Sequence, residues 1–86
     1  MPFHDHDLQR LAHLSRLERA LVRQGEPVMW DLGFARLVVG GPSEQASVRT
    51  ALLGGQWLYT WDGWPWCRVD AVDEGVAQLL LRKVSS

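Results

Sequence analysis

The segment QWLYTWDGWPWCRV, residues 56–69, contains four of the five tryptophans of the chain and its clearest turn. The central pair, Asp62-Gly63, suits a two-residue type I′ turn, because both central positions of that turn require positive φ. Residues that favour strands stand on both sides of the pair. The segment therefore predicts a β-hairpin, with strands at 56–61 and 64–69.

The turn also predicts which residues of this hairpin face one another. Counting outward from the turn gives three pairs on one side, namely Trp61 with Trp64, Tyr59 with Trp66, and Trp57 with Arg68. Directly opposed residues share a face of a sheet, so we predict one face that carries the four tryptophans, Tyr59 and Arg68. The opposite face then carries Leu58, Thr60, Pro65, Cys67 and Val69. Proline lacks a backbone N–H, which places the second strand at a sheet edge.

Two amphipathic segments flank the strands and supply apolar stripes that must be buried. Residues 5–25, DHDLQRLAHLSRLERALVRQG, predict a helix that Asp5 or Asp7 caps and that Gly25 ends. Its stripe repeats every three or four residues and consists of Leu8, Leu11, Leu14, Leu17 and Leu21.

The second helix is predicted over residues 70–84, DAVDEGVAQLLLRKV, with Asp70 as its cap. Its apolar face consists of Val72, Val76, Leu79, Leu80 and Val84. Gly75 interrupts this helix at a cost of about 1 kcal/mol relative to alanine.

Between the first helix and the hairpin, the apolar period changes to that of strands. VMWDLG (28–33), FARLVVGG (34–41) and ASVRTALLGG (46–55) read as strands, with the polar loop GGPSEQ (40–45) before the third. We therefore predict a single α+β domain over residues 1–86. It has an N-terminal helix, an antiparallel meander of four or five strands, and a C-terminal helix.

Composition narrows the class of protein. With 86 residues and 47% hydrophobic content, the chain is a small globular domain rather than a disordered segment. A net charge of −1 does not suggest binding to nucleic acid or to an anionic membrane. The apolar runs are far shorter than the roughly 20 residues of a membrane helix, and we find no secretory signal. We expect a soluble, cytoplasmic protein with no internal disulfide, since Cys67 is the only cysteine.

Other candidate sites are weaker than the hairpin. His4, His6 and His13 have a spacing that fits no closed zinc site, so we expect a solvated N-terminus and no metal or cofactor. Arg16, Arg19 and Arg23 form a basic strip on one side of the first helix. We interpret the strip as a solvated face, with docking to an acidic partner as the alternative. No nucleophile and base stand in a recognised pattern, so we expect no enzyme activity.

The aromatic face of the hairpin allows two interpretations. In one, the helices cover it and it is core. In the other, they cover the opposite face and leave the aromatics for a partner. We favour partial exposure of the aromatics at an interface, because five rings would crowd beneath two short helices. Exposed patches of this size usually mark association, and tryptophan, tyrosine and arginine dominate binding hot spots. The candidate binding residues are Trp57, Tyr59, Trp61, Trp64, Trp66 and Arg68.

Residues 50–84 also resemble a group of short actinobacterial proteins of uncharacterised function. The pattern consists of Trp57, Tyr59, Trp61, Gly63, Asp70, Asp73, Ala77, Leu80 and Val84; Pro65 and Cys67 are not part of it. Such proteins are often encoded beside helix-turn-helix regulators. The resemblance implies an accessory or regulatory role and supplies no catalytic residues.

These observations predict a non-enzymatic protein-interaction or regulatory accessory module. Its partner is another protein or a second copy, and we expect a homodimer with Trp61 and Trp64 near the centre of the interface, because so small a domain gains by sharing its core. The alternative is a small-ligand domain that binds a carbohydrate or a nucleotide on the same tryptophan face.

Overall fold

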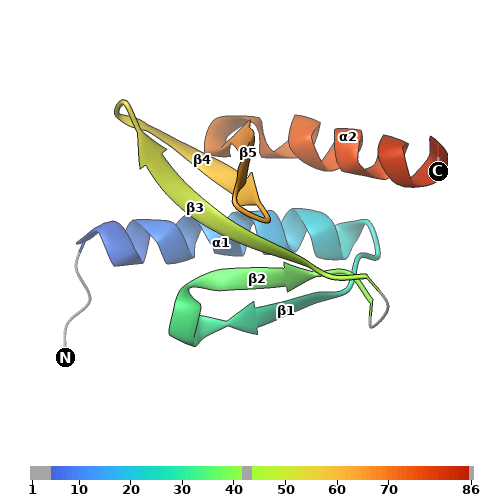
Figure 1. Cartoon of the computed structure of the whole chain (residues 1–86), viewed down its shortest axis with the longest axis horizontal. Helices are drawn as coiled ribbons and strands as arrows, with labels where there is room; N and C mark the ends of the chain where they lie inside the picture. The colour runs from blue at the N-terminus through green and yellow to red at the C-terminus, as the bar shows by residue number, and fades with distance from the viewer. Residues whose placement is uncertain (1–4, 42–43, 86) are drawn as a thin grey trace.

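The computed structural model describes residues 5–41 and 44–85, with two helices and five strands between them (Figure 1). The elements are α1 (Asp5–Arg23), β1 (Val28–Asp31), β2 (Arg36–Val39), β3 (Ala46–Leu53), β4 (Gln56–Trp61), β5 (Trp64–Arg68) and α2 (Val72–Ser85). Short 3-10 turns precede β2 (η1, Leu32–Phe34) and α2 (η2, Val69–Ala71). The predicted α+β architecture is confirmed.

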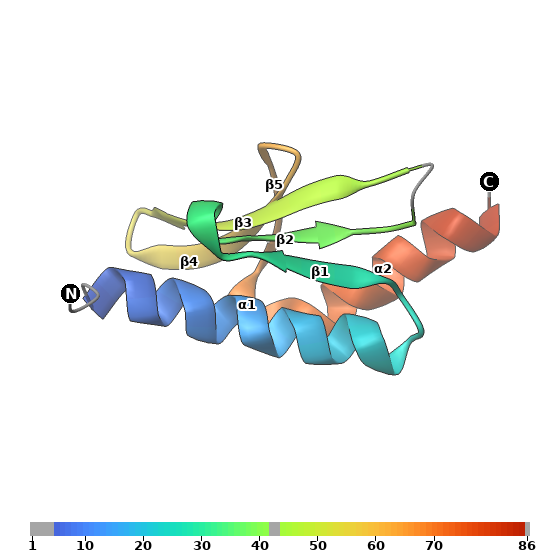
Figure 2. The same cartoon turned by 90° about the horizontal axis from the view of Figure 1, so that it is seen from below.

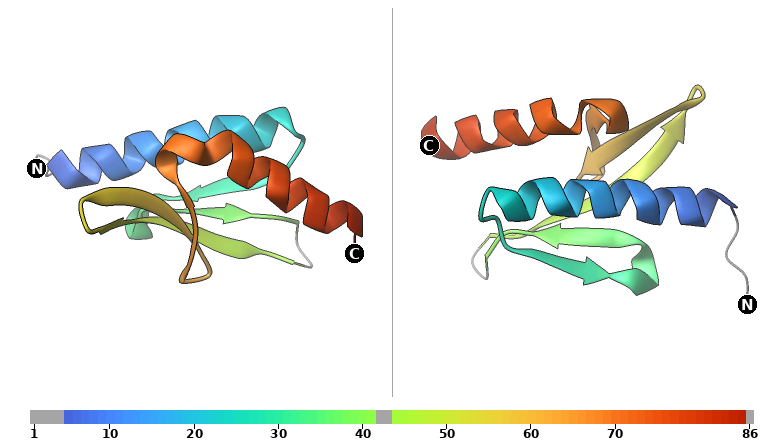
Figure 3. Two further views of the ribbon diagram at one scale, coloured as in Figure 1. Left: turned by 90° about the horizontal axis from the view of Figure 1, so that it is seen from above. Right: turned by 180° about the vertical axis from the view of Figure 1, so that it is seen from behind.

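The strands form one antiparallel sheet in the order β1-β2-β3-β4-β5, so each strand pairs with its neighbour in sequence. Both helices pack on the same face of this sheet, and the other face has no helix over it (Figures 2 and 3). The β4–β5 turn projects from the body on the side away from α1 (Figure 2). The end of the aromatic face next to this turn is called its open end below.

The core lies between the two helices and the covered face of the sheet. Helix α1 supplies Leu14, Leu17 and Leu21, all fully buried, whereas Leu8 near its start is 53% exposed. Strand β3 alternates as the strand period requires, with Val48 buried and its neighbours less so. The buried cluster consists of Leu14, Leu17, Leu21, Leu37, Val39, Val48, Tyr59, Val76 and Leu79. The predicted leucine stripe is therefore buried in its C-terminal part.

The ends of both helices differ slightly from the prediction. Helix α1 ends at Arg23, and Gly25 follows with a φ of 79°, the left-handed conformation that closes a helix at little steric cost for glycine. Asp70 lies within η2, where its carboxylate accepts a hydrogen bond from Arg68 at 2.7 Å. The predicted cap at Asp70 is thus replaced by an ion pair in the turn before α2. The side chain of Val84 lies outside the described residues.

The hairpin turn is the predicted one, but the pairing changes two residues beyond it. Asp62 and Gly63 both have positive φ, 51° and 89°, as a type I′ turn requires. Trp61 pairs with Trp64, as predicted. Tyr59 then pairs with Cys67 instead of Trp66, because a β-bulge inserts Trp66 as an extra residue in β5.

The bulge follows Pro65 directly, which explains its position, since proline in a sheet is confined to edges and bulges. β5 is an edge strand, as Pro65 predicted. Because a bulge shifts the alternation by one residue, it moves Arg68 to the opposite face, where it pairs with Leu58. The prediction that Arg68 lies beside the tryptophans is therefore wrong.

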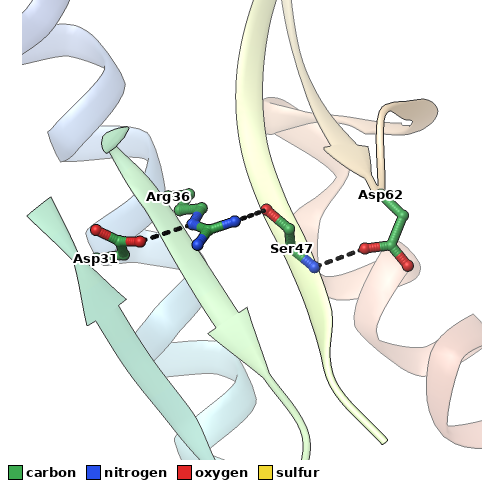
Figure 4. A network of polar contacts seen from close by, with 4 residues as sticks. All are labelled: Asp31, Arg36, Ser47 and Asp62. Atoms are coloured by element: carbon green, nitrogen blue, oxygen red, sulfur yellow. Dashed lines mark hydrogen bonds and ion pairs between the residues drawn. The ribbon is translucent and has the colours of Figure 1, made fainter. Parts of the chain in front are cut away.

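A polar network joins the strands on the face that the helices leave open (Figure 4). Arg36 Nε donates to Asp31 at 2.8 Å, and an Arg36 terminal nitrogen donates to Ser47 Oγ at 3.3 Å. The backbone N–H of Ser47 donates to Asp62 Oδ1 at 2.7 Å. The network therefore links β1, β2 and β3 to the β4–β5 turn, and it holds the turn in place.

None of the helices in the described part of the chain has the length and apolar character that crossing a membrane requires.

Candidate functional site

The helices cover the aromatic face of the hairpin, so the prediction that they cover the opposite face is wrong. The cover is incomplete, and the aromatic face is partly exposed, since Trp64 is 76% exposed. Tyr59 is completely buried, and its hydroxyl donates a hydrogen bond to the backbone carbonyl of His13 on α1 at 2.6 Å. Trp57 Nε1 donates to the side-chain oxygen of Gln9 at 3.1 Å. Helix α1 thus closes over the first half of β4.

Tyr59 serves the core rather than a binding surface. Burial raises the pKa of its hydroxyl, although the charge of nearby Arg16 acts in the opposite direction. The neutral hydroxyl suits its role as a donor to a backbone carbonyl, since a buried polar group needs a partner. The structure therefore removes Tyr59 from the accessible binding residues.

The remaining tryptophans of the hairpin lie at its open end. Trp66 packs against Tyr59 and, edge to face, against Trp61, with ring centroids 5.3 Å apart in the second pair and planes inclined by 69°. Both Trp61 and Trp66 are half-buried. Trp64 is 76% exposed, which makes it the most exposed of the large hydrophobic side chains in the described part of the chain. The open end therefore has two rings that pack against each other, Trp61 and Trp66, and one ring, Trp64, that is mostly exposed.

A cleft of about 690 Å³ lies beside these three rings. Its apolar wall continues from the tryptophans to Val39 and Leu79. Its polar lining includes two carboxylates, Glu44 and Asp62, and the amide side chain of Gln78 on α2. Among the described lining residues there is no arginine, lysine or histidine. The described lining of the cleft is therefore largely aromatic and apolar, and its charged groups are two carboxylates.

Gly75 explains how α2 comes close enough to form a wall of this cleft. A methyl group at this position would collide with Cys67 Sγ and would lie 3.5 Å from the Trp66 ring. The glycine, interpreted from the sequence as a cost to helix stability, is therefore a packing requirement. Its place opposite the bulge allows Trp66 and Cys67 to face α2 together.

Cys67 has no feature of a reactive thiol. It is partly buried against α2, and burial raises the pKa of the thiol to about 11. A thiol becomes nucleophilic as the thiolate, which a raised pKa disfavours at neutral pH. Cys67 acts as a small apolar residue at the interface between β5 and α2.

The other residues singled out in the sequence lie away from the cleft. Arg68 is exposed and pairs with Asp70 at 2.7 Å on the opposite face of β5. The basic strip of Arg16, Arg19 and Arg23 is exposed along α1, and none of the three lines the cleft. The structure therefore separates the basic strip from the aromatic site.

Of the three histidines considered as metal ligands, the structure describes the side chain of His13. His4 lies outside the described residues, as does the side chain of His6. His13 packs its ring against Trp57, and burial together with Arg16 lowers its pKa. Within the described residues, no group of three histidine, cysteine, aspartate or glutamate side chains lies together in an arrangement that could hold a metal.

Sequence reasoning missed Glu44 and Gln78 as cleft residues, and it predicted Leu79 only as part of the apolar face of the second helix. Glu44 lies in the connection between β2 and β3, whereas Gln78 and Leu79 come from α2, so only tertiary packing brings them to the hairpin. Gly75 is the one local clue, because a glycine inside a helix often marks a close approach.

Comparison of the chain with protein-family models, with curated proteins and with solved structures found no match in any of the three.

Proposed function

We propose that the chain is a non-enzymatic interaction module that binds a protein partner at the cleft beside Trp64. The observation that carries the proposal is the exposure of Trp64 next to the half-buried rings of Trp61 and Trp66. Covering about 150 Å² of an aromatic side chain at ~25 cal/mol per Å² would contribute about 4 kcal/mol. A protein surface that covers this ring gains that contribution.

The surroundings of Trp64 have the composition of a binding hot spot. Such sites combine an accessible aromatic with neighbouring residues that exclude water. Here the Trp61 and Trp66 rings brace each other before any partner arrives, so little side-chain entropy is lost on binding. The resemblance to short proteins encoded beside helix-turn-helix regulators agrees with an accessory role of this kind.

The charge of the cleft disfavours the nucleotide alternative. Glu44 and Asp62 would repel a phosphate, and none of the described lining residues is basic. Single-strand and nucleotide sites combine aromatic platforms with positive charge. A neutral carbohydrate meets no such objection, and it is included below as a competing ligand.

The test is a photo-crosslinking amino acid at position 64, compared with the same amino acid at position 34. Phe34 is a matched control, because it is 65% exposed and lies on η1, at the opposite end of β2 from the cleft. We expect a discrete adduct at position 64 only. Its mass distinguishes a second copy of the chain from another protein.

The adduct must then be rebuilt from purified components. We expect Trp64→Ser to weaken the complex at least about tenfold, which is about 1.4 kcal/mol, and Phe34→Ser to leave its Kd unchanged. Equal crosslinking at both positions, or a rebuilt complex that tolerates Trp64→Ser, would refute the proposed function.

A further inference from the structure

We infer that the cleft takes an arginine side chain of the partner, held among Trp61, Trp64 and Trp66. The inference rests on the proposed function, because it names the chemistry by which that site recognises its partner. It starts from the coincidence of three aromatic rings and two carboxylates around one cleft, with no basic residue among the described lining residues.

The aromatic rings offer what a planar cation needs. A guanidinium stacks on the face of tryptophan through attraction to the negative face of the ring. Trp61 and Trp66 meet at 69°, so their rings form a corner rather than a flat wall. Trp64 stands directly opposite Trp61 across the hairpin. A side chain entering the cleft therefore meets ring surfaces from more than one direction.

The carboxylates supply the charge that an arginine requires. Glu44 and Asp62 both line the cleft and are exposed. One oxygen of Asp62 accepts a hydrogen bond from the Ser47 backbone, which holds the carboxylate in place (Figure 4). A carboxylate has two oxygens with about four acceptor sites, so the group can also accept from a guanidinium. Charge-assisted pairs of this kind are stronger than neutral hydrogen bonds.

The chain already shows this chemistry elsewhere on its surface. The Arg36 guanidinium carbon lies 5.4 Å from the centre of the Phe34 ring while Arg36 Nε donates to Asp31. Arg10 lies 5.9 Å from the Trp57 ring. In the cleft the rings and the carboxylates are present and the described lining residues include no arginine. An arginine of the partner would add a guanidinium to these rings and carboxylates.

Nuclear magnetic resonance of the tryptophan indole N–H groups tests the inference with internal controls. The probe is the blocked peptide Gly-Ser-Arg-Ser-Gly, compared with the same peptide carrying citrulline, a neutral shape analogue of arginine. We expect the arginine peptide to shift the indole signals of Trp61, Trp64 and Trp66. Trp30 and Trp57 should not shift, because their indoles donate to Glu18 and Gln9 away from the cleft.

The inference also predicts how much each change in the peptide or in the protein weakens binding. Citrulline should bind about tenfold more weakly than arginine, within the range of a cation–π contribution. Trp64→Ala should reduce the affinity for the arginine peptide about tenfold, and Glu44→Gln should reduce it about threefold at low salt, with a smaller effect at high salt. Phe34→Ala should have no effect.

Four outcomes would overturn the inference. They are no shifts with the arginine peptide, equal binding of the citrulline peptide, tighter binding of a glutamate peptide or of maltotriose at the same indoles, and shifts spread over all five tryptophans. If the crosslinked complex forms but the arginine peptide causes no shifts, the proposed function stands and the arginine site does not. If the arginine peptide binds at these indoles but no partner is crosslinked at position 64, the arginine site stands and the proposed function does not.

Discussion

Tyr59 and Trp61 stand on the same strand and the same face of the sheet, yet helix α1 buries the first completely, whereas the second is half-buried beside an open cleft. The covered half of the face consists of Trp57 and Tyr59, which donate hydrogen bonds to α1. The open half consists of Trp61, Trp64 and Trp66, next to the turn that projects from the body. The comparison teaches that an aromatic hairpin can be core and binding surface at once, according to which helix reaches each part.

The largest difference between the two halves should appear on removal of a ring from each. Tyr59→Ala is expected to lower the free energy of unfolding by about 3–5 kcal/mol, because it empties a fully buried position. Trp64→Ala should change it by less than about 1 kcal/mol, since little of that ring is packed. Urea denaturation measures both. Similar losses of stability for the two variants would contradict the distinction between the covered and the open half of the face.

The contact between β5 and α2, which supports the open half, should be sensitive to one methyl group. Gly75→Ala is expected to lower the free energy of unfolding by about 1–3 kcal/mol through overpacking against Cys67. The gain of about 1 kcal/mol in helix propensity offsets part of this cost, so the net loss is expected to be up to about 2 kcal/mol. Gly41→Ala is the matched control, because a methyl group there meets nothing within 4 Å. Adding Cys67→Ala should restore part of the loss, and a stabilised Gly75→Ala protein would contradict the packing described.

The dependence of stability on high pH tests whether Cys67, in the contact that supports the open half, is buried. Burial raises the pKa of Cys67 from 9.0 to about 11, so the folded state holds the thiol proton more tightly than the unfolded chain does. Its stabilising contribution is present below pH 9 and is lost as the pH rises towards 11. The pKa of Tyr59 is also raised, which extends the loss above pH 10. Urea denaturation of Cys67→Ala should show a shallower fall between pH 9 and 11, and an unchanged slope would argue against a buried thiol.

The smallest effect on stability, and the largest on association, is expected at the tip of the hairpin. Trp64→Glu should change the free energy of unfolding of the monomer by less than about 0.5 kcal/mol, because this side chain is mostly exposed. We predict that the native chain is a homodimer at tens of micromolar (~10⁻⁵ M) and that this variant is monomeric, by light scattering. A monomeric native chain would exclude self-association. A dimer that survives the substitution would place the interface elsewhere.

The local features of the fold could be predicted because they depend on neighbouring residues. The type I′ turn follows from Asp62-Gly63, and the leucine spacing predicts α1 without knowledge of the surface on which it packs. Each strand of the meander is followed by a turn or connection that the sequence marks, so the order of the elements was also accessible. The pairing of Trp61 with Trp64 belongs here, since it lies one step from the turn.

The bulge, the covered face and the cleft were decided only by tertiary structure. Pro65 permits a bulge, but the register shift brings Trp66 and Cys67 against Gly75, which lies in another element. That shift sends Arg68 to the opposite face, a consequence that no local pattern contains. Which side of a sheet receives two helices depends on the sum of many distant contacts. The amino-acid sequence therefore determined that the tryptophans would lie together, and the packing of α1 and α2 decided which of them remain accessible.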